Sequence, residues 1–445
     1  MSIRRRILLA MSANALGQGI TILSQIFLTP LFFAQWGAER YGEWLLLSTI
    51  PAYLLLADFG IGSAAANEMS MHAAGGDLAA AQRSFRGVLK VSRTIALVIC
   101  CVTLLFALSP GSSSLLHLNT MSGNDAQAII LMYSLNVGLS FQLGVMAAGF
   151  RCAGQNASCI LVGNLFRLLE VILTGVLLLL GQSPLTICAS LLFPKALNYL
   201  LTWFWLQRIC PWLFHPRVEA DRSLVRRLVK PSLAFLAFPV GNALALQGPI
   251  LIIGLVFGPS LVAVFSAMRT IARIPYQVTF AFSSSVSPEM TFAFGAGNFS
   301  LLRQLHRKSW LLNALLVSAV ALVICICGEW LINTWLHKSV TLDTNLLNGL
   351  LITTLFLSLW SASSMVLLSS NNHTQLARQY LMVNGLGFLA AYIAASLGNV
   401  TGLVSALAAV ELIMLLVTMP LALSASRDTL GNFFKGLLFR SRHAF

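Results

Sequence analysis

Residues 63–77 of the chain read SAAANEMSMHAAGGD, and residues 284–298 read SSVSPEMTFAFGAGN, 221 positions later. Both stretches begin with serine, carry a Glu-Met pair at the same place and have a glycine before their last residue. The same offset holds in other pairs: Gly37 and Gly258, Thr49-Ile50 and Thr270-Ile271, Arg86 and Arg307, Arg5-Arg6 and Arg226-Arg227. An offset kept without a gap predicts that the chain consists of two similar halves.

The composition indicates a membrane protein. Of the 445 residues, 57% are hydrophobic and only 9% are charged, and the mean hydropathy is +0.82. Soluble domains carry about 25% charged residues. Two similar halves in so apolar a chain are typical of a transporter whose site lies between the halves.

Twelve stretches have the roughly 20 apolar residues that a helix needs to cross a bilayer. They are 13–34, 42–66, 90–109, 128–150, 158–181, 185–207, 232–257, 260–287, 309–331, 346–369, 379–398 and 401–424. We therefore predict an all-α polytopic membrane protein, with an N-terminal lobe over 1–222 and a C-terminal lobe over 223–445. Six helices per lobe is an even number, so the repeat is parallel, with its pseudo-twofold axis along the membrane normal.

The positive charges predict the orientation. If the N-terminus is cytoplasmic, most of the 28 Lys and Arg residues fall in cytoplasmic segments, and only Arg40 and Lys338 lie in outside loops. This distribution predicts that both termini are cytoplasmic. The apolar run after Arg6 is too short for the core of a signal peptide, so we expect it to begin the first helix. The net charge of +14 then reflects orientation, and binding of nucleic acid is not expected.

Two cytoplasmic segments, 67–89 and 288–308, occupy matching places in the repeat. Each has a glycine-bearing turn and then a basic amphipathic run. Asp77 and Asn298 follow the glycines and suit helix N-caps. We expect the helices after them to lie along the lipid head groups.

Several charged residues fall within the predicted spans, near the middle of the bilayer: Arg167, Lys195, Arg269 and Glu411. A basic side chain there costs about 2.5–3.5 kcal/mol if it faces lipid. Arg273 follows Arg269 by four residues and shares its helix face. We therefore expect both arginines to face a hydrated cavity.

Pairing within the protein is the competing interpretation of these charges. Arg167 and Glu170 are three residues apart on one helix, which favours a structural pair. Lys195 and Glu411 lie at the same depth in corresponding helices. The sequence favours equally that they pair with each other between the halves and that they have separate roles. A cavity role for Arg167 and Lys195 is thus one of two alternatives for each.

Arg269 and Arg273 have no acid on their own helix face, and their expected acidic partners are Asp58 and Glu68 in and after the second span. We therefore predict a cationic face of a central cavity that includes these four residues. Amide side chains in the matching first, seventh and eighth spans extend the predicted site: Gln18, Gln25, Asn242, Gln247 and Gln277. For each amide the alternative is a hydrogen bond between helices.

A motif at the start of the second span resembles a known family. Tyr41-Gly42-Glu43-Trp44, then Asp58-Phe59-Gly60-Ile61-Gly62-Ser63, Asn67-Glu68 and Gly75-Gly76-Asp77, resemble polysaccharide flippases of the Wzx type. These belong to the multidrug/oligosaccharidyl-lipid/polysaccharide exporter superfamily. The resemblance covers the twelve-helix layout, and its residue-level match is concentrated in 37–90.

The resemblance implies transport of an undecaprenyl-pyrophosphate-linked oligosaccharide from the inner to the outer leaflet of a bacterial cytoplasmic (inner) membrane. It implies a role in O-antigen, lipopolysaccharide or other surface polysaccharide biosynthesis. The expected partners are that lipid-linked substrate, membrane lipids and the polysaccharide polymerase machinery. No cofactor or metal is expected.

Other functions stay open. A cation-coupled multidrug exporter shares the superfamily, and Asp58, Glu170 and Glu411 are the candidates for ion coupling. A lipid II flippase typically has two further helices. A membrane polymerase or glycosyltransferase is disfavoured, because the acids near the predicted outer face are scattered and form no paired motif. No phosphate-binding loop of the Gly-x-x-x-x-Gly-Lys type is present.

Overall fold

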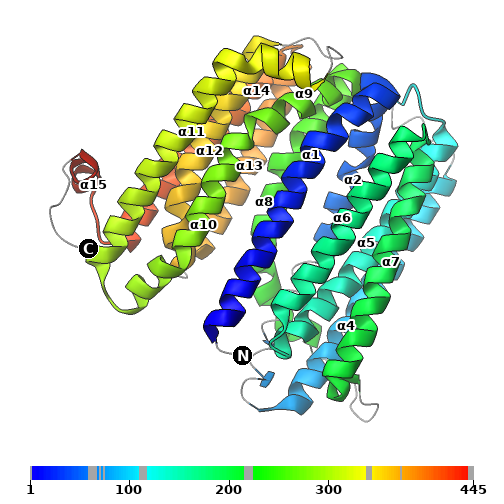
Figure 1. Cartoon of the computed structure of the whole chain (residues 1–445), viewed down its shortest axis with the longest axis horizontal. Helices are drawn as coiled ribbons and strands as arrows, with labels where there is room; N and C mark the ends of the chain where they lie inside the picture. The colour runs from blue at the N-terminus through cyan, green and yellow to red at the C-terminus, as the bar shows by residue number, and fades with distance from the viewer. Residues whose placement is uncertain are drawn as a thin grey trace. The chain divides into compact units, whose positions relative to one another are not determined.

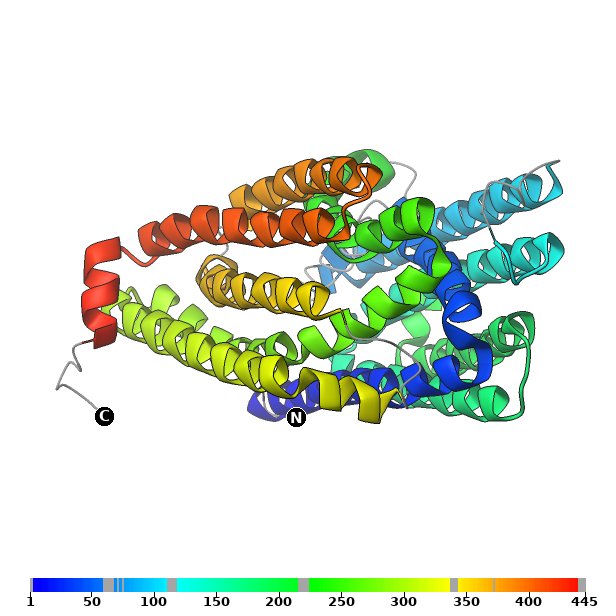
Figure 2. The same cartoon turned by 90° about the horizontal axis from the view of Figure 1, so that it is seen from above.

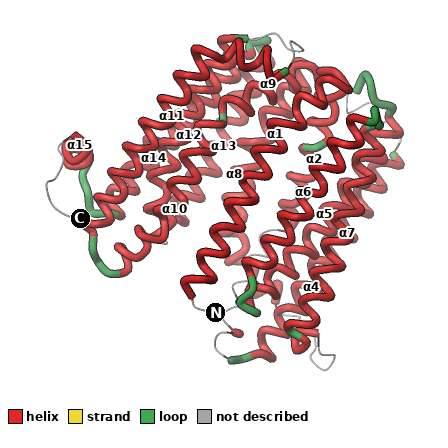
Figure 3. The backbone as a smooth tube through the Cα atoms, in the orientation of Figure 1, coloured by secondary structure: helices red, strands yellow, loops and turns green. Residues whose placement is uncertain are grey.

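The computed structural model describes residues 3–58, 68–69, 72–73, 76–109, 118–214, 224–336, 343–370 and 373–438. These residues form helices and no strand (Figure 3). The all-α polytopic fold predicted from the sequence is therefore confirmed. Residues 59–67, which carry part of the motif that resembles the flippases, lie outside the described residues.

The chain forms two compact units. The first comprises 1–239 and 258–262, and the second comprises 240–257 and 263–445. The boundary that the sequence predicts after residue 222 stays a prediction. Among the described residues, nine helices are long and apolar enough to span a bilayer. The first of these, Ser12–Ala57, covers most of the first two predicted spans and has a kink between them at Gly37. The ninth and twelfth predicted spans, 309–331 and 401–424, each lie within one such helix.

In the first unit, α4 packs against α5, α5 against α7, and α1 against α6 (Figure 1). Its helices are α1 (Ile3–Leu47), α2 (Thr49–Leu54), α4 (Leu78–Leu108), α5 (Gly123–Cys152), α6 (Asn156–Leu179) and α7 (Pro184–Ile209), with short 3-10 helices η1 (Leu55–Asp58) and η3 (Pro211–Phe214). A buried apolar cluster joins α4, α5, α7 and η3 around Phe85, Phe150 and Leu206.

In the second unit, α12 is the central helix and packs against α10, α11 and α14, while α13 packs against α14. The remaining helices of the chain are α8 (Leu224–Phe257), α9 (Pro259–Ala272), α10 (Ile274–Gly295), α11 (Phe299–Trp335), α12 (Thr344–Ser369), α13 (His373–Ser396), α14 (Val400–Ala425) and α15 (Leu430–Leu438). α8 begins in the first unit and ends in the second, and only the first turn of α9 belongs to the first unit.

The backbone keeps the repeat at its glycines. Gly37 and Gly258, which are paired by the offset, have φ of 70° and 89°. Gly76 and Gly297, the second such pair, have φ of 81° and 67°. Only glycine adopts these values without strain. The pairs therefore mark the same two turns in each half.

The predicted N-caps are confirmed. The Asp77 carboxylate accepts a hydrogen bond from the amide of Ala80 at 2.9 Å. The Asn298 side-chain oxygen accepts one from the amide of Leu301 at 3.0 Å. The two caps also share their backbone conformation, with φ and ψ of −84° and 73° at Asp77 and −83° and 71° at Asn298.

The expectation that separate helices follow these caps and lie along the lipid head groups is wrong. α4 runs unbroken for 31 residues, or about 46 Å, and α11 for 37 residues, or about 55 Å. Both exceed the roughly 30 Å of a bilayer core. No proline separates the basic run from the apolar run in either segment, so the helix continues through both.

Two of the spans that we predicted as single helices are broken. The span over 42–66 begins at the end of α1 and continues as α2 and η1, and the span over 260–287 is divided into α9 and α10. Pro51 lies four residues after Leu47, the last residue of α1, and Pro275 follows the end of α9 closely. A proline removes a backbone donor and clashes with the carbonyl four residues before it.

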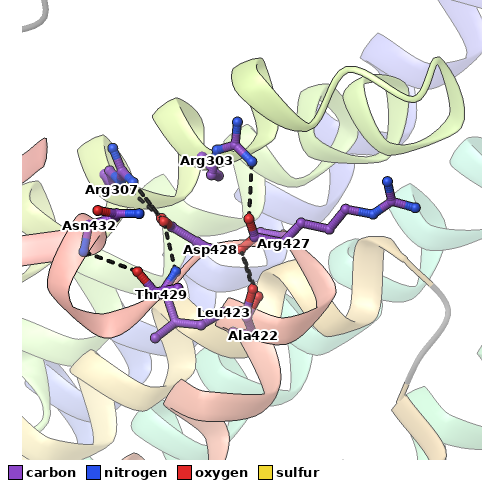
Figure 4. Close-up of polar contacts among 9 residues, drawn as sticks. Arg303, Arg307, Ala422, Leu423, Arg427, Asp428, Thr429 and Asn432 are labelled. Carbon is purple, nitrogen blue, oxygen red and sulfur yellow. Dashed lines mark hydrogen bonds and ion pairs between the residues drawn. The ribbon is translucent and has the colours of Figure 1, made fainter.

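An arginine near the start of α4 and its repeat partner in α11 hold the segment that follows the last spanning helix of each unit. Arg86 donates to the carbonyl of Phe214 at 3.1 Å. Arg307 donates two parallel bonds to the carboxylate of Asp428, at 2.8 Å and 3.0 Å (Figure 4). Beyond Asp428, α15 lies across the ends of α11 and α14 (Figure 2), and its Phe433 is fully buried.

Candidate functional site

A small cavity of about 110 Å³ lies within the second unit. α8, α12, α13 and α14 surround it, together with the junction between α9 and α10. The side chains that determine its chemistry are Asn242, Arg269, Arg273, Tyr276, Trp360 and Glu411. It therefore combines two guanidinium groups and one carboxylate with hydrogen-bonding and aromatic groups.

Glycines allow the surrounding helices to approach closely. A Cβ atom at Gly248 of α8 would lie 2.7 Å from the ring of Phe388 in α13. One at Gly387 of α13 would lie 2.0 Å from the side chain of Val410 in α14. Both distances are shorter than a van der Waals contact, so any larger residue would push α13 away from α8 or α14.

The break between α9 and α10 falls at Arg273, yet the backbone hydrogen bonds continue through it. The amide of Arg273 donates to the carbonyl of Arg269 at 3.0 Å, and that of Gln277 donates to the carbonyl of Arg273 at 3.1 Å. The four-residue spacing of the arginines therefore still places them on one face, and both line the cavity. Their role in binding stays a prediction.

Arg269 is held by the backbone and by an aromatic ring. Its guanidinium donates to the carbonyl of Leu246 in α8 at 2.7 Å and lies 5.3 Å from the centre of the Phe265 ring. Both contacts stabilise a cation away from bulk water. Arg269 thus shapes the wall of the cavity as well as contributing its charge.

Glu411 of α14 is the acid beside the arginines. Its carboxylate accepts a hydrogen bond from the indole of Trp360 at 2.6 Å and interacts electrostatically with Arg273. Arg273 also lies over the ring of Tyr276, 5.5 Å from its centre. The packing of α14 in the second unit thus brings Glu411 beside Arg273, an acid that was not among the partners expected from the sequence. Pairing of the arginines with Asp58 or Glu68 stays a prediction.

Three predicted residues meet in the first unit. Glu170, on α6, interacts electrostatically with Lys195 of α7 and with Arg167 one turn away. The Arg167 side chain is exposed and that of Lys195 is half-buried. This arrangement favours the structural interpretation of Arg167 and Glu170, and it gives Lys195 an acidic neighbour in its own unit. A pair between Lys195 and Glu411 stays a prediction.

Glu68 has local contacts before α4. Its carboxylate accepts a hydrogen bond from the hydroxyl of Ser84 at 3.0 Å and lies 3.7 Å from the ring nitrogen of His72. The Asp58 backbone ends η1, and its side chain lies outside the described residues. Among the described residues, Glu68 does not line the cavity in the second unit.

The predicted amides are dispersed. Asn242 lines the cavity. Gln247 and Gln277 are half-buried in the second unit without lining it. Gln18 is exposed and Gln25 half-buried on α1. Of the five amides predicted at the site, Asn242 alone is among the described residues that line the cavity. A role in binding for the other four stays a prediction.

Sequence reasoning missed the two tyrosines of the cavity. Tyr276, Trp360 and Tyr380 all line it, and the rings of Trp360 and Tyr380 lie 5.7 Å apart. Asn384 also lines it and donates to the carbonyl of Tyr380 at 2.9 Å. The available signal was the spacing of Tyr380 and Asn384, two polar side chains four residues apart on one face of an apolar helix.

Comparisons with known proteins support the same fold. The MatE family model matches residues 249–393, about a third of the chain. No curated protein sequence matches the chain.

Solved structures of similar fold cover almost the whole chain. One is the inward-facing conformation of a multidrug resistance MATE family transporter of the MOP superfamily, with a TM-score of 0.72, 13% identity and coverage of 94% of this chain and 96% of that one. An outward-facing conformation of such a transporter has a TM-score of 0.63 at 14% identity, covering 97% and 96%. A MOP superfamily transporter from Pyrococcus furiosus, whose binding pocket is described as having reverse polarity, has a TM-score of 0.63 at 14% identity, covering 95% and 96%. The chain is thus a multi-pass membrane protein with the fold of MATE transporters.

Proposed function

We propose that the chain is a flippase that moves undecaprenyl-pyrophosphate-linked oligosaccharide from the inner to the outer leaflet by alternating access. The observation that carries this proposal is the cavity of the second unit, where Arg269 and Arg273 face one carboxylate. Two cations against one acid favour a ligand with negative charge. The motif at the start of the second span supports the same substrate class.

The size of the cavity limits what enters it. Pockets for drug-sized ligands measure about 300–1,000 Å³, whereas this one measures about 110 Å³. In the proposed cycle, only a pyrophosphate oxygen or its water shell reaches the arginines. Because Glu411 interacts with Arg273, an arriving phosphate competes with that carboxylate for the same guanidinium. Binding of substrate is thereby linked to a rearrangement around α14.

A cation-coupled multidrug exporter is the second candidate. The observation in its favour is Glu411 itself, an intramembrane carboxylate that lines the cavity and that a proton or Na⁺ can neutralise. Glu170 and Asp58 are further candidates for ion coupling. Two of the solved structures of similar fold are multidrug resistance transporters. The structure of the Pyrococcus furiosus transporter is described as suggesting a different function, so the fold accommodates both polarities of pocket.

The first experiment measures lipid-linked oligosaccharides in a host strain that lacks the gene. Copies encoding the wild type, Arg273→Ala, Arg273→Lys and Arg303→Ala are added back, and the amount of inserted protein is compared in isolated membranes. Arg303 is half-buried and donates to the carbonyl of Arg427 outside the cavity, so it is the matched control for loss of one positive charge.

We expect the deletion to accumulate the lipid-linked oligosaccharide and to lose its surface polymer. The wild type and Arg303→Ala restore export, Arg273→Ala does not, and Arg273→Lys restores it in part because a lysine cannot bind two phosphate oxygens in parallel. Unchanged lipid-linked oligosaccharide in the deletion strain contradicts the flippase. Increased accumulation of cationic drugs in that strain then supports the exporter.

A further inference from the structure

A second hollow lies on the first unit, between α4, the end of α7 and η3. It measures about 630 Å³ and is open on one side, so we call it the basic groove. The side chains that define it are Arg86, Lys90, Arg93, Leu97, Trp203 and Phe214. It belongs to the first unit alone and shares no residue with the cavity described above.

Three basic side chains follow one face of α4. Arg86, Lys90 and Arg93 are spaced by four and then three residues, which places them on the same side of the helix. Lys90 and Arg93 are exposed, and Arg86 is oriented by its bond to the carbonyl of Phe214 at 3.1 Å. Among the described residues that line the basic groove, these three carry the only charges. The groove is therefore strongly cationic.

The basic groove lies where a membrane surface is expected. α4 ends at Leu108, and the roughly 20 residues that cross a bilayer core, counted back from there, begin near residue 89. Arg86 and Lys90 are then at the level of the lipid phosphates. Arg93 is about one turn inside, from where its long side chain reaches the surface.

An aromatic and an aliphatic side chain complete the groove on the side of the hydrocarbon. The guanidinium of Arg93 lies 5.7 Å from the centre of the Trp203 ring, and tryptophan is enriched at membrane interfaces. One turn deeper on α4, Leu97 also lines the groove and is 65% exposed. The groove thus changes from cationic to apolar along α4, as a phospholipid changes from phosphate to acyl chain.

The second half of the repeat lacks this pattern. At the offset of 221, Lys90 and Arg93 correspond to Leu311 and Ala314. The counterpart of Arg86 is Arg307, whose guanidinium is bound to the Asp428 carboxylate. Since α4 and α11 are equivalent helices with the same backbone conformation at their N-caps, the extra charges are a property of the first unit rather than of the repeat.

We propose that the basic groove binds the head group of an anionic phospholipid from the leaflet that the positive charges predict to be cytoplasmic. Arg86, Lys90 and Arg93 bind the phosphate and the further negative charge, while one acyl chain lies along Leu97. Basic pockets between spanning helices on this side of a membrane suit such head groups. The inference is independent of the transported substrate.

The test is lipid binding to the purified full-length protein after removal of lipid in a mild detergent. Native mass spectrometry measures the affinity for phosphatidylglycerol and for phosphatidylcholine. The variant is Lys90→Ala with Arg93→Ala, and the matched control is Arg83→Ala with Arg208→Ala. Arg83 and Arg208 are exposed basic residues of α4 and α7 outside the groove.

We expect the wild type to prefer phosphatidylglycerol. Each basic side chain at a membrane surface contributes about fivefold to the binding of an anionic lipid. Loss of Lys90 and Arg93 should therefore weaken the binding of phosphatidylglycerol about 25-fold and leave the affinity for phosphatidylcholine unchanged. The melting temperature of the variant without lipid should stay close to that of the wild type. The Arg83 and Arg208 control should keep the wild-type affinity.

Three results would overturn the proposal. One is equal affinity of the wild type for the two phospholipids, and another is an equal loss in the variant and the control. The third is displacement of phosphatidylglycerol from the groove by inorganic pyrophosphate or by equimolar undecaprenyl pyrophosphate. The first of those competitors would assign the groove to a soluble phosphate, and the second to the lipid-linked substrate.

Discussion

Replacing Glu43 with glutamine tests whether this acid of the motif is structural. Glu43 is fully buried, near the end of α1. One carboxylate oxygen accepts from the amides of Asn119 and Thr120, the latter at 2.8 Å. The other accepts from the hydroxyl of Thr120 and from the amide of Met121 at 3.0 Å. The carboxylate thus holds the turn that precedes α5.

The expected loss follows from these four bonds. In its better orientation, the glutamine oxygen keeps the amides of Asn119 and Thr120. The new amide nitrogen donates to the Thr120 hydroxyl after that hydroxyl rotates, but it cannot accept from Met121. One buried backbone donor is left without an acceptor, which costs about 1–3 kcal/mol. At the middle of this range, about 2 kcal/mol, the ratio of folded to unfolded protein falls about 30-fold.

The assay is equilibrium unfolding of the purified protein by sodium dodecyl sulfate in mixed micelles, followed by tryptophan fluorescence. Glu39→Gln is the matched control. Glu39 lies one turn earlier and accepts a single exposed hydrogen bond, from the side chain of Asn119 at 3.0 Å, so its loss should change stability by less than about 0.5 kcal/mol. Equal stability of Glu43→Gln and Glu39→Gln would refute the reasoning.

Three further predictions concern other contacts. Arg307→Ala leaves the carboxylate of Asp428, which is 2% exposed, buried without its partner, and we expect a loss of about 3–5 kcal/mol and faster proteolysis at α15. Gly42→Ala places a methyl group 1.7 Å from a carbonyl oxygen at the start of α9, so the melting temperature should fall, whereas Gly19→Ala, with open space at its Cβ, should be neutral. Trp360→Phe removes the 2.6 Å bond to the carboxylate of α14; it should reduce transport per inserted protein and lower the melting temperature, because a buried carboxylate loses a donor.

The controls for these variants use the same assays. Arg303→Ala removes a half-buried arginine that contacts the same segment (Figure 4), and it should leave proteolysis unchanged. Trp205→Phe changes an indole outside the cavity and should retain transport. Wild-type resistance of Arg307→Ala, or wild-type transport by Trp360→Phe, would contradict the corresponding prediction.

The candidate site shows how far a pattern of charges reaches. The spacing of Arg269 and Arg273 predicts a shared face, and both line one cavity. From the sequence we expected their acid in the second span, whereas in the structure Glu411 lies beside Arg273. Depth along a helix follows from counting residues, but the neighbour at that depth depends on which helices pack together. Tyr276 and Tyr380 were missed for the same reason.

The sequence by itself determined the helical membrane fold, the two-fold repeat and the local turns. Composition requires apolar helices, since a bilayer core offers backbone groups no other partners, and glycines such as Gly37 and Gly258 mark equivalent turns because few other residues adopt positive φ. Only the tertiary structure decided that α4 and α11 run on past their basic segments and that Glu411 faces Arg273. Those features depend on side chains far apart in sequence, and their contacts exist only once the helices have packed.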